Sequence, residues 1–231
     1  MSLLMQLNYA LFQSINGLAG IYPWLDALMV FCANYLVFCL PLVMLLMWGR
    51  PLAWRKQQLS NGEQEMLHER RAAVLWVAIA CLAAYAINLL IEQVIFEPRP
   101  FITHHVVHQL ITHAADGSFP SDHTAWAFAV GGMFLLQLLP ARKMARLQKR
   151  ETGENTLLKA LNYPAWITLL TFAMGCAIGF ARVFVGVHYP GDILGGAFDG
   201  LIAAIVITLI RVLLNKPTNA ILRFAGNMRL A

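Results

Sequence analysis

Long apolar runs separated by shorter polar stretches follow one another through the whole chain. A helix needs about 20 predominantly apolar residues to cross a bilayer. Five stretches have that character, at residues 24–48, 72–95, 122–140, 162–181 and 193–214. The pattern predicts an all-α fold, a polytopic transmembrane helical bundle with five spanning helices that forms a single domain over residues 1–231.

The first 22 residues carry a weaker signal. Apolar residues recur at helical spacing from Leu3 to Ile15 with Gln, Asn and Ser between them, and Gly17 and Gly20 then interrupt the pattern. An N-terminal amphipathic helix in the outer interface and a sixth spanning helix both fit this stretch. No basic residue precedes the apolar run, so we do not expect a cleaved signal peptide.

The composition agrees with a membrane protein. Hydrophobic residues make up 59% of the chain and charged residues 13%, against about 25% charged residues in a soluble domain. The four cysteines lie inside apolar runs and lack CxxC spacing, which favours core-filling thiols over a disulfide or metal set (Cys32, Cys39, Cys81 and Cys176).

The basic residues are distributed asymmetrically. Of the 17 Lys and Arg residues, all but Arg99 and Arg182 fall in residues 49–71, in residues 141–161 or after residue 210, which share one side if five helices alternate. Loops rich in Lys and Arg stay in the cytoplasm, so the loop at 96–121 faces outward. The net charge of +5 flanks helices instead of forming one patch, and no nucleic-acid partner is expected.

Three polar clusters lie at the outer ends of these segments. Arg99 precedes Pro100, and a guanidinium group is a permanently charged, planar fork that matches phosphate oxygens. Ser121, Asp122 and His123 open the third segment, where free backbone N–H groups and the helix dipole favour an anion. Taken alone, each cluster is also compatible with an ordinary helix stop or cap.

The third cluster joins the fourth and fifth segments. It runs from Arg182 to His188 and then to Asp192 through a Tyr-Pro-Gly turn. A neutral imidazole attacks phosphorus well near neutral pH, and a carboxylate on the other ring nitrogen fixes the tautomer and stabilises the developing positive charge. His188 is therefore a candidate nucleophile oriented by Asp192, with a helix-capping pair as the structural alternative.

Together the clusters resemble the signature of the type-2 phosphatidic acid phosphatase superfamily, Lys-x6-Arg-Pro, Pro-Ser-Gly-His and Ser-Arg-x5-His-x3-Asp. The spacing of the last two motifs is intact, while Glu92 replaces the lysine, Asp122 the glycine and Ala181 the serine. Ser-Phe-Pro-Ser-Asp-His, preceded by His113-Ala-Ala-Asp116, is similar to one branch, the bacitracin-resistance-type undecaprenyl-diphosphate phosphatases, which also tend to lack the lysine.

The resemblance implies a membrane lipid phosphatase that needs no metal or cofactor. It implies that His188 attacks the phosphate in line and becomes phosphohistidine, that Asp192 orients it, and that His123 protonates the leaving oxygen. The residues that surround the phosphate are then Arg99, Ser121, His123 and Arg182. The implied substrate is undecaprenyl diphosphate, converted to undecaprenyl phosphate at the periplasmic face of a bacterial inner membrane.

Other functions stay open at this point. A phosphatase of phosphatidylglycerol phosphate, phosphatidic acid or lipid A would use the same residues, and so would transfer of phosphate to another lipid. A transporter or flippase is the alternative from a different class, but its polar residues would line a path through the membrane instead of gathering at one face.

Several further residues are accessory candidates. Glu97 and Asp116 either position a catalytic water or second phosphate or are solvated loop acids, and Glu92 and Asp199 lie in apolar helices, where acids pack toward the site or handle protons. The spacing of the loop histidines suggests zinc but supplies no clear third and fourth ligand (His104, His105, His108 and His113). Two four-residue glycine spacings predict close packing of the fourth and fifth segments (Gly175–Gly179 and Gly196–Gly200).

Overall fold

The computed structural model describes residues 3–49, 61–152 and 165–227, and regular structure in these ranges is helical throughout. This confirms the all-α prediction. The predicted span 24–48 is divided into two helices, the other four predicted spans each lie on one helix, and residues 162–164 of the fourth lie outside the described residues. The elements in order are α1 (Leu3–Asn16), α2 (Pro23–Asn34), the 3-10 turn η1 (Leu36–Phe38), α3 (Cys39–Trp48), α4 (Asn61–Glu92), α5 (Pro100–Thr103), α6 (Asp122–Thr152), α8 (Ala165–Phe184) and α9 (Pro190–Asn227).

Length and composition allow several of these helices to cross a membrane. Leu67–Glu92, Trp166–Phe184 and Pro190–Arg211 each qualify, and the pair Pro23–Asn34 and Leu36–Trp48, bent by 45°, makes a fourth if it counts as one span. The remaining predicted span begins α6, where side chains are described as far as Gln137. The chain is a membrane protein, and a count of five spans stays a prediction.

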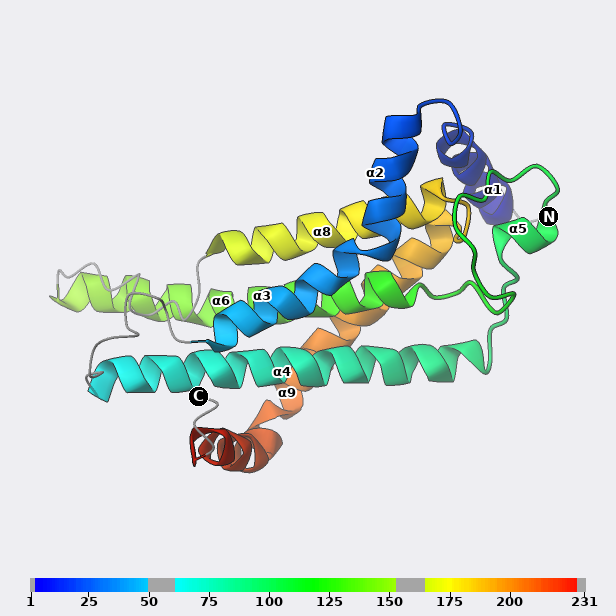
Figure 1. Cartoon of the computed structure of the whole chain (residues 1–231). Helices are drawn as coiled ribbons and strands as arrows, with labels where there is room; N and C mark the ends of the chain where they lie inside the picture. Colours follow the sequence, from blue (N-terminus) through cyan, green and yellow to red (C-terminus); the bar gives the residue numbers. More distant parts are fainter. Residues whose placement is uncertain (1–2, 50–60, 153–164, 228–231) are drawn as a thin grey trace.

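Helix α6 lies at the centre of the bundle and packs against α4, α8 and α9 (Figure 1). Alanines on this helix are fully buried, and they let neighbouring backbones approach closely (Ala125, Ala127 and Ala129). A side chain at Gly196 would strike the carbonyl of Ser121, and one at Gly200 would strike that of Ala125. Tight contact between α6 and α9 therefore depends on these two glycines.

This contact corrects the sequence prediction about the glycine pairs. Gly175 faces Phe128 and Ala127 of α6, and only Gly179 touches α9, through Ile193. The pairs serve mainly to pack α8 and α9 onto α6 and not onto each other. The sequence pattern identifies a close approach but not its partner, because small residues at four-residue spacing fit any neighbouring helix.

Helix α1 packs one face against the protein, and this face carries apolar as well as polar side chains. Leu4 and Leu11 are 78% and 55% exposed, whereas Phe12 and Asn16 are buried. Fourteen residues rise about 21 Å, less than the roughly 30 Å hydrocarbon core. This length favours the interfacial placement over a sixth span, with leucines toward lipid.

The far end of α3 is held by arginines of α4. Arg70 donates hydrogen bonds to the carbonyls of Leu46 and Met47, and Arg71 donates one to that of Trp48. These two belong to the basic set used to predict orientation. Most of the others lie outside the residues, or the side chains, that the structure describes.

Candidate active site

All three sequence clusters meet at one end of the bundle. Arg99 lies in the loop after α4, Ser121 immediately before α6, and His188 in the connection between α8 and α9 (Figure 1). Every residue from 181 to 189 is buried. The loop after α4 is tied to this connection by a backbone hydrogen bond from Leu110 N–H to the carbonyl of Val185, at 3.1 Å.

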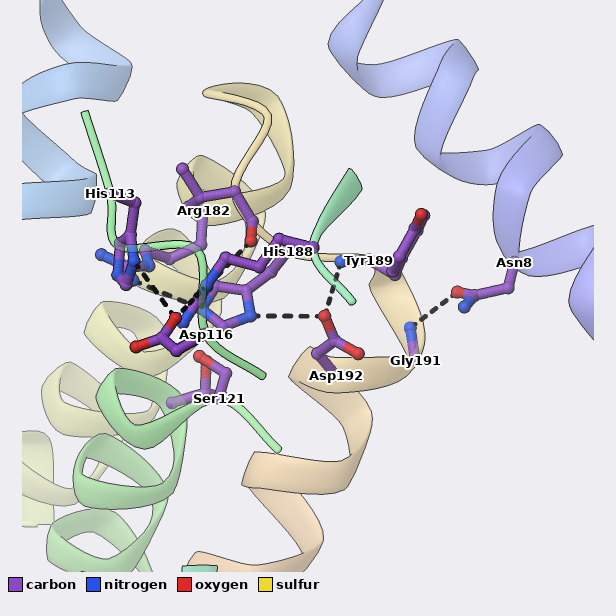
Figure 2. A network of polar contacts seen from close by, with 12 residues as sticks. Asn8, His113, Asp116, Ser121, Arg182, His188, Tyr189, Gly191 and Asp192 are labelled. Atoms are coloured by element: carbon purple, nitrogen blue, oxygen red, sulfur yellow. Dashed lines mark hydrogen bonds and ion pairs between the residues drawn. The ribbon is translucent and has the colours of Figure 1, made fainter. Parts of the chain in front are cut away.

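His188 and Asp192 form the predicted pair across the start of α9 (Figure 2). The His188 Nδ1 atom lies 3.3 Å from Asp192 Oδ2, and both side chains are almost fully buried. The same carboxylate oxygen accepts the Tyr189 backbone N–H at 2.8 Å. Because Pro190 and Gly191 turn the chain into α9, a carboxylate at its first turn reaches back to the imidazole.

The second ring nitrogen of His188 faces both motif arginines. Its Nε2 atom lies 3.2 Å from Arg99 Nη1 and 3.3 Å from Arg182 Nη2. Guanidinium nitrogens only donate hydrogen bonds, so Nε2 is the acceptor and carries a lone pair. Nδ1 then carries the proton and donates it to Asp192. The neighbours of the ring thus select the tautomer that leaves Nε2 free to attack.

Burial and two positive charges keep His188 neutral. Burial lowers the pKa of His188 well below 6.5, and the charges of Arg182 and Arg99 lower it further. A neutral imidazole is the nucleophilic form.

Each arginine is held in place by a loop residue as well as by backbone. Arg99 Nε donates to Asp116 Oδ1 at 2.7 Å and Arg99 Nη1 to the Val187 carbonyl at 3.0 Å. Arg182 Nη2 lies 3.0 Å from His113 Nε2, which is therefore an acceptor. Burial and the charges of Arg99 and Arg182 lower the pKa of His113, which favours that neutral form. The loop at 113–116 thus braces both guanidinium groups from one side.

Ser121 and His123 bring the start of α6 to the same place. Ser121 is fully buried, and its hydroxyl oxygen accepts a hydrogen bond from Thr124 at 3.2 Å. The sequence predicts that backbone N–H groups at the start of this helix are free to bind an anion. The Ser121 N–H is not free, because it donates to the Asp192 carbonyl at 3.1 Å. His123 stacks on Trp126, and its imidazole is close enough to Arg182 for the guanidinium charge to act on it.

The accessory acids separate into different environments. Asp116 joins the site through Arg99, and although burial raises its pKa, the hydrogen bond and charge of Arg99 bring the pKa below 3.8. Asp122 instead accepts a hydrogen bond from Asn88 at 2.7 Å. Glu97 is half-buried, and burial, together with the charge of Asp192, raises its pKa. Glu92 is exposed at the end of α4.

Asp199 is buried in α9, and neither of its carboxylate oxygens has a hydrogen-bond partner among the described residues. Its two predicted roles, packing and proton handling, both stay predictions.

The loop histidines do not converge on one point. His104 stacks on Tyr9 with ring centroids 3.9 Å apart, His108 is tied to Asn16 through its backbone, and His113 binds Arg182. Within the described part of the chain, no three His, Cys, Asp or Glu side chains lie close enough together to hold a metal ion.

Sequence reasoning missed two asparagines of α1. Asn16 donates to the carbonyls of Phe184 and His108 at 2.8 and 2.9 Å and accepts the His108 backbone N–H at 3.0 Å. Asn8 accepts the Gly191 N–H at 2.8 Å, within the turn that joins His188 to Asp192 (Figure 2). The available signal was an amide at each of two positions eight residues apart on one helix face.

Comparison with known proteins gives a consistent family. The model of the PAP2 superfamily matches residues 73–216. The protein named undecaprenyl-diphosphatase BcrC of Bacillus subtilis (strain 168) is 35% identical over 201 residues, covering 87% of this chain and 80% of that one. The putative undecaprenyl-diphosphatase YbjG of Escherichia coli (strain K12) is 27% identical, covering 88% and 82%.

A third relative carries a different kind of name. The bacitracin transport permease protein BcrC of Bacillus licheniformis is 29% identical over 202 residues, covering 87% of this chain and 79% of its own.

Two solved structures share the fold. Aquifex aeolicus LpxE superposes with a TM-score of 0.57 at 23% identity, covering 87% of this chain and 94% of that one. The transmembrane PAP2-type phosphatidylglycerolphosphate phosphatase from Bacillus subtilis also gives 0.57, at 17% identity, covering 91% and 87%. At these identities the likeness shows the architecture alone.

Proposed function

This chain belongs to the PAP2 superfamily and is a membrane lipid phosphatase, and from that premise we propose that it hydrolyses undecaprenyl diphosphate to undecaprenyl phosphate and inorganic phosphate. The observation that carries the proposal is the arrangement around His188. One ring nitrogen is oriented by Asp192, and the other faces two guanidinium groups at 3.2 and 3.3 Å.

In the first step, His188 Nε2 attacks the terminal phosphorus of the diphosphate. The bond from that phosphorus to the bridging oxygen breaks, and the oxygen takes a proton from His123 as undecaprenyl phosphate leaves. Arg99 and Arg182 turn from the Nε2 lone pair to the equatorial phosphate oxygens, where charge is greatest in the transition state. Asp192 stabilises the positive charge that the ring acquires.

In the second step, water attacks the phosphohistidine. His123, now neutral, takes a proton from this water, and the phosphorus–nitrogen bond breaks to give inorganic phosphate and free His188. Each proton that His123 gives in the first step returns to it in the second. Proton transfer by a positioned side chain contributes roughly 10²–10⁴-fold to the rate.

Relatives named undecaprenyl-diphosphatase support the substrate. The departures from the superfamily signature also support it, since Asp122 in place of glycine and Glu92 in place of lysine are features in which the chain resembles the undecaprenyl-diphosphate phosphatase branch. A phosphatase of another lipid phosphate uses the same geometry, so the lipid panel below decides between them. Transport, suggested by the name of one relative, gains no support from a buried imidazole–carboxylate pair at one end of the bundle.

We place the enzyme in a bacterial inner membrane with its site toward the periplasm, as one domain with polyprenyl diphosphate as its lipid partner. The arginines that hold the end of α3, away from the site, agree with a cytoplasmic position for that end.

Phosphate release by purified protein tests the proposal, with undecaprenyl diphosphate, phosphatidylglycerol phosphate, phosphatidic acid and lipid A diphosphate as substrates. We expect the first to give the highest kcat/KM. His188→Gln should abolish release and also the alkali-stable, acid-labile label left on the protein by terminally labelled diphosphate. His105→Gln, at an exposed histidine of the outer loop between α5 and α6, is the matched control. Full turnover by His188→Gln contradicts the proposed nucleophile, and preference for another lipid contradicts the proposed substrate.

A further inference from the structure

An apolar pocket of about 400 Å³ lies between α3, α4 and α6. Its walls come from η1 and α3 (Val37, Leu40 and Met44), from α4 (Leu82 and Tyr85) and from α6 (Trp126). None of the residues that line it is charged. Such a surface offers a hydrocarbon ligand close packing and offers a charged ligand no partner of opposite charge.

The bend between α2 and α3 builds one wall of this pocket. The helix axis turns by 45° at η1, and Val37, in the middle of the turn, is buried against the core. Without the bend, one straight helix would run past α4 at this level. Val37 in the turn, with Leu40 and Met44 in the helix that follows it, thus forms one wall of the pocket.

The pocket adjoins the candidate active site at Trp126, which lines the pocket and stacks on His123. The Trp126 ring stacks on His123 with centroids 6.1 Å apart and an interplanar angle of 28°. It also lies 6.2 Å from the ring of Tyr85 on the pocket side. Trp126 is therefore the shared wall between the residue that would protonate the leaving oxygen and the apolar cavity. The leaving oxygen is part of the lipid phosphate, and the lipid phosphate carries the tail of the substrate.

Resting on the function proposed above, we infer that this pocket binds the first isoprene units of a single polyprenyl tail. At about 30 Å³ for a water-sized group, 400 Å³ takes on the order of a dozen carbon atoms, so the rest of the tail stays in the hydrocarbon. The pocket admits one chain beside the leaving oxygen. A diacyl phospholipid carries two chains from one glycerol, so its second chain must remain outside.

The pocket opens toward the lipid phase beside exposed side chains of α4. Leu82 is 69% exposed and Tyr85 is 42% exposed, so a tail enters from the lipid phase without passing through water. A tail in a membrane or micelle already avoids water. Its gain in the pocket therefore comes from packing and not from the hydrophobic effect, and we expect selectivity on the order of tenfold.

A pair of matched substitutions on α4 tests the inference. Ala78→Phe places a ring in the pocket, which Ala78 lines, and Ala86→Phe places the same ring on an exposed position outside it. Tyr85→Ala widens the pocket at an exposed residue, so its folding is less at risk. The substrates are isopentenyl diphosphate, whose single isoprene unit is too short to fill the pocket, farnesyl diphosphate and undecaprenyl diphosphate.

We expect Ala78→Phe and Tyr85→Ala to raise KM for the two longer diphosphates about tenfold and to leave the isopentenyl rate unchanged. Ala86→Phe should match the unaltered enzyme on all three. Equal losses on all three substrates, or no loss on the longer ones, would overturn the pocket assignment. If the unaltered enzyme hydrolyses none of the diphosphates, the proposed function fails instead, so the two failures are distinguishable.

Discussion

Replacement of Asp192 by Asn tests how the carboxylate acts on His188. Asp192 Oδ2 accepts from both the Tyr189 backbone N–H at 2.8 Å and His188 Nδ1 at 3.3 Å. A backbone N–H only donates, so the amide of Asn should keep its oxygen at this position. The other carboxylate oxygen, Oδ1, has no partner among the described residues, and an NH₂ group there displaces no existing bond.

The tautomer of His188 should therefore survive the change to Asn, and only the negative charge is lost. A hydrogen bond to a charged group contributes about 1.5–3 kcal/mol, which corresponds to roughly 10- to 150-fold in rate. Asp192→Ala also removes the acceptor, and we expect it to lose on the order of 10⁴-fold, as happens when a catalytic imidazole loses its orientation.

Single-turnover formation of phosphohistidine, measured by rapid quench with terminally labelled undecaprenyl diphosphate, separates the two variants. KM should change little in either, because Asp192 does not contact the phosphate in the proposed scheme. Equal losses in Asp192→Asn and Asp192→Ala would show that charge and not tautomer controls the step. Full activity in Asp192→Asn would refute the reasoning altogether.

The remaining predictions concern pH, the N-terminal helix, helix packing and topology. The pKa of His188 lies below 6.5 in the folded chain because of burial, so the unfolded chain takes up the proton first. Stability should therefore fall as pH drops below about 6.5. The melting temperature of His188→Gln should depend less on pH in that range. Asn16→Ala leaves three backbone groups without partners and should lower activity and expose the loop at 104–118 to protease, whereas Ser14→Ala, on the exposed side, should not. Gly200→Ala places a methyl group against the Ala125 carbonyl and should cost about 1–3 kcal/mol, while Gly49→Ala, with its nearest neighbour at 3.7 Å, should melt like the unaltered protein. A cysteine at Val106, which is 77% exposed, should react with a membrane-impermeant maleimide added to the periplasmic side, and labelling only from the cytoplasmic side contradicts the proposed orientation.

Sequence alone was enough to predict the helices, and it supplied the residues on which the proposed chemistry rests. Apolar length is enough to predict a spanning helix, because an unpaired backbone group in hydrocarbon is too costly for other structures. The three clusters were recognisable because phosphate chemistry needs a small set of residue types at fixed local spacing. His188 and Asp192 are four residues apart across a Pro-Gly turn, so their contact is a local property of the chain.

The neighbours of the site residues, in contrast, follow from tertiary packing and were not predictable from the sequence. The side-chain partners of Arg99 and Arg182 both come from the loop at 113–116, which is 17 residues from Arg99 and 69 from Arg182, and no local pattern specifies them. Of the four paired glycines, only Gly179 has the predicted neighbour, because helical spacing fixes a face but not the helix that covers it. In the sequence, Asn8 and Asn16 fit the solvent-facing side of an interfacial helix. In the structure, they form hydrogen bonds with backbone groups of the α8–α9 connection and the outer loop. The apolar pocket takes one wall from the bend at η1, and its position beside His123 follows from the packing of three helices. Local spacing reaches only a few residues along a helix, whereas these contacts depend on where separate helices are packed.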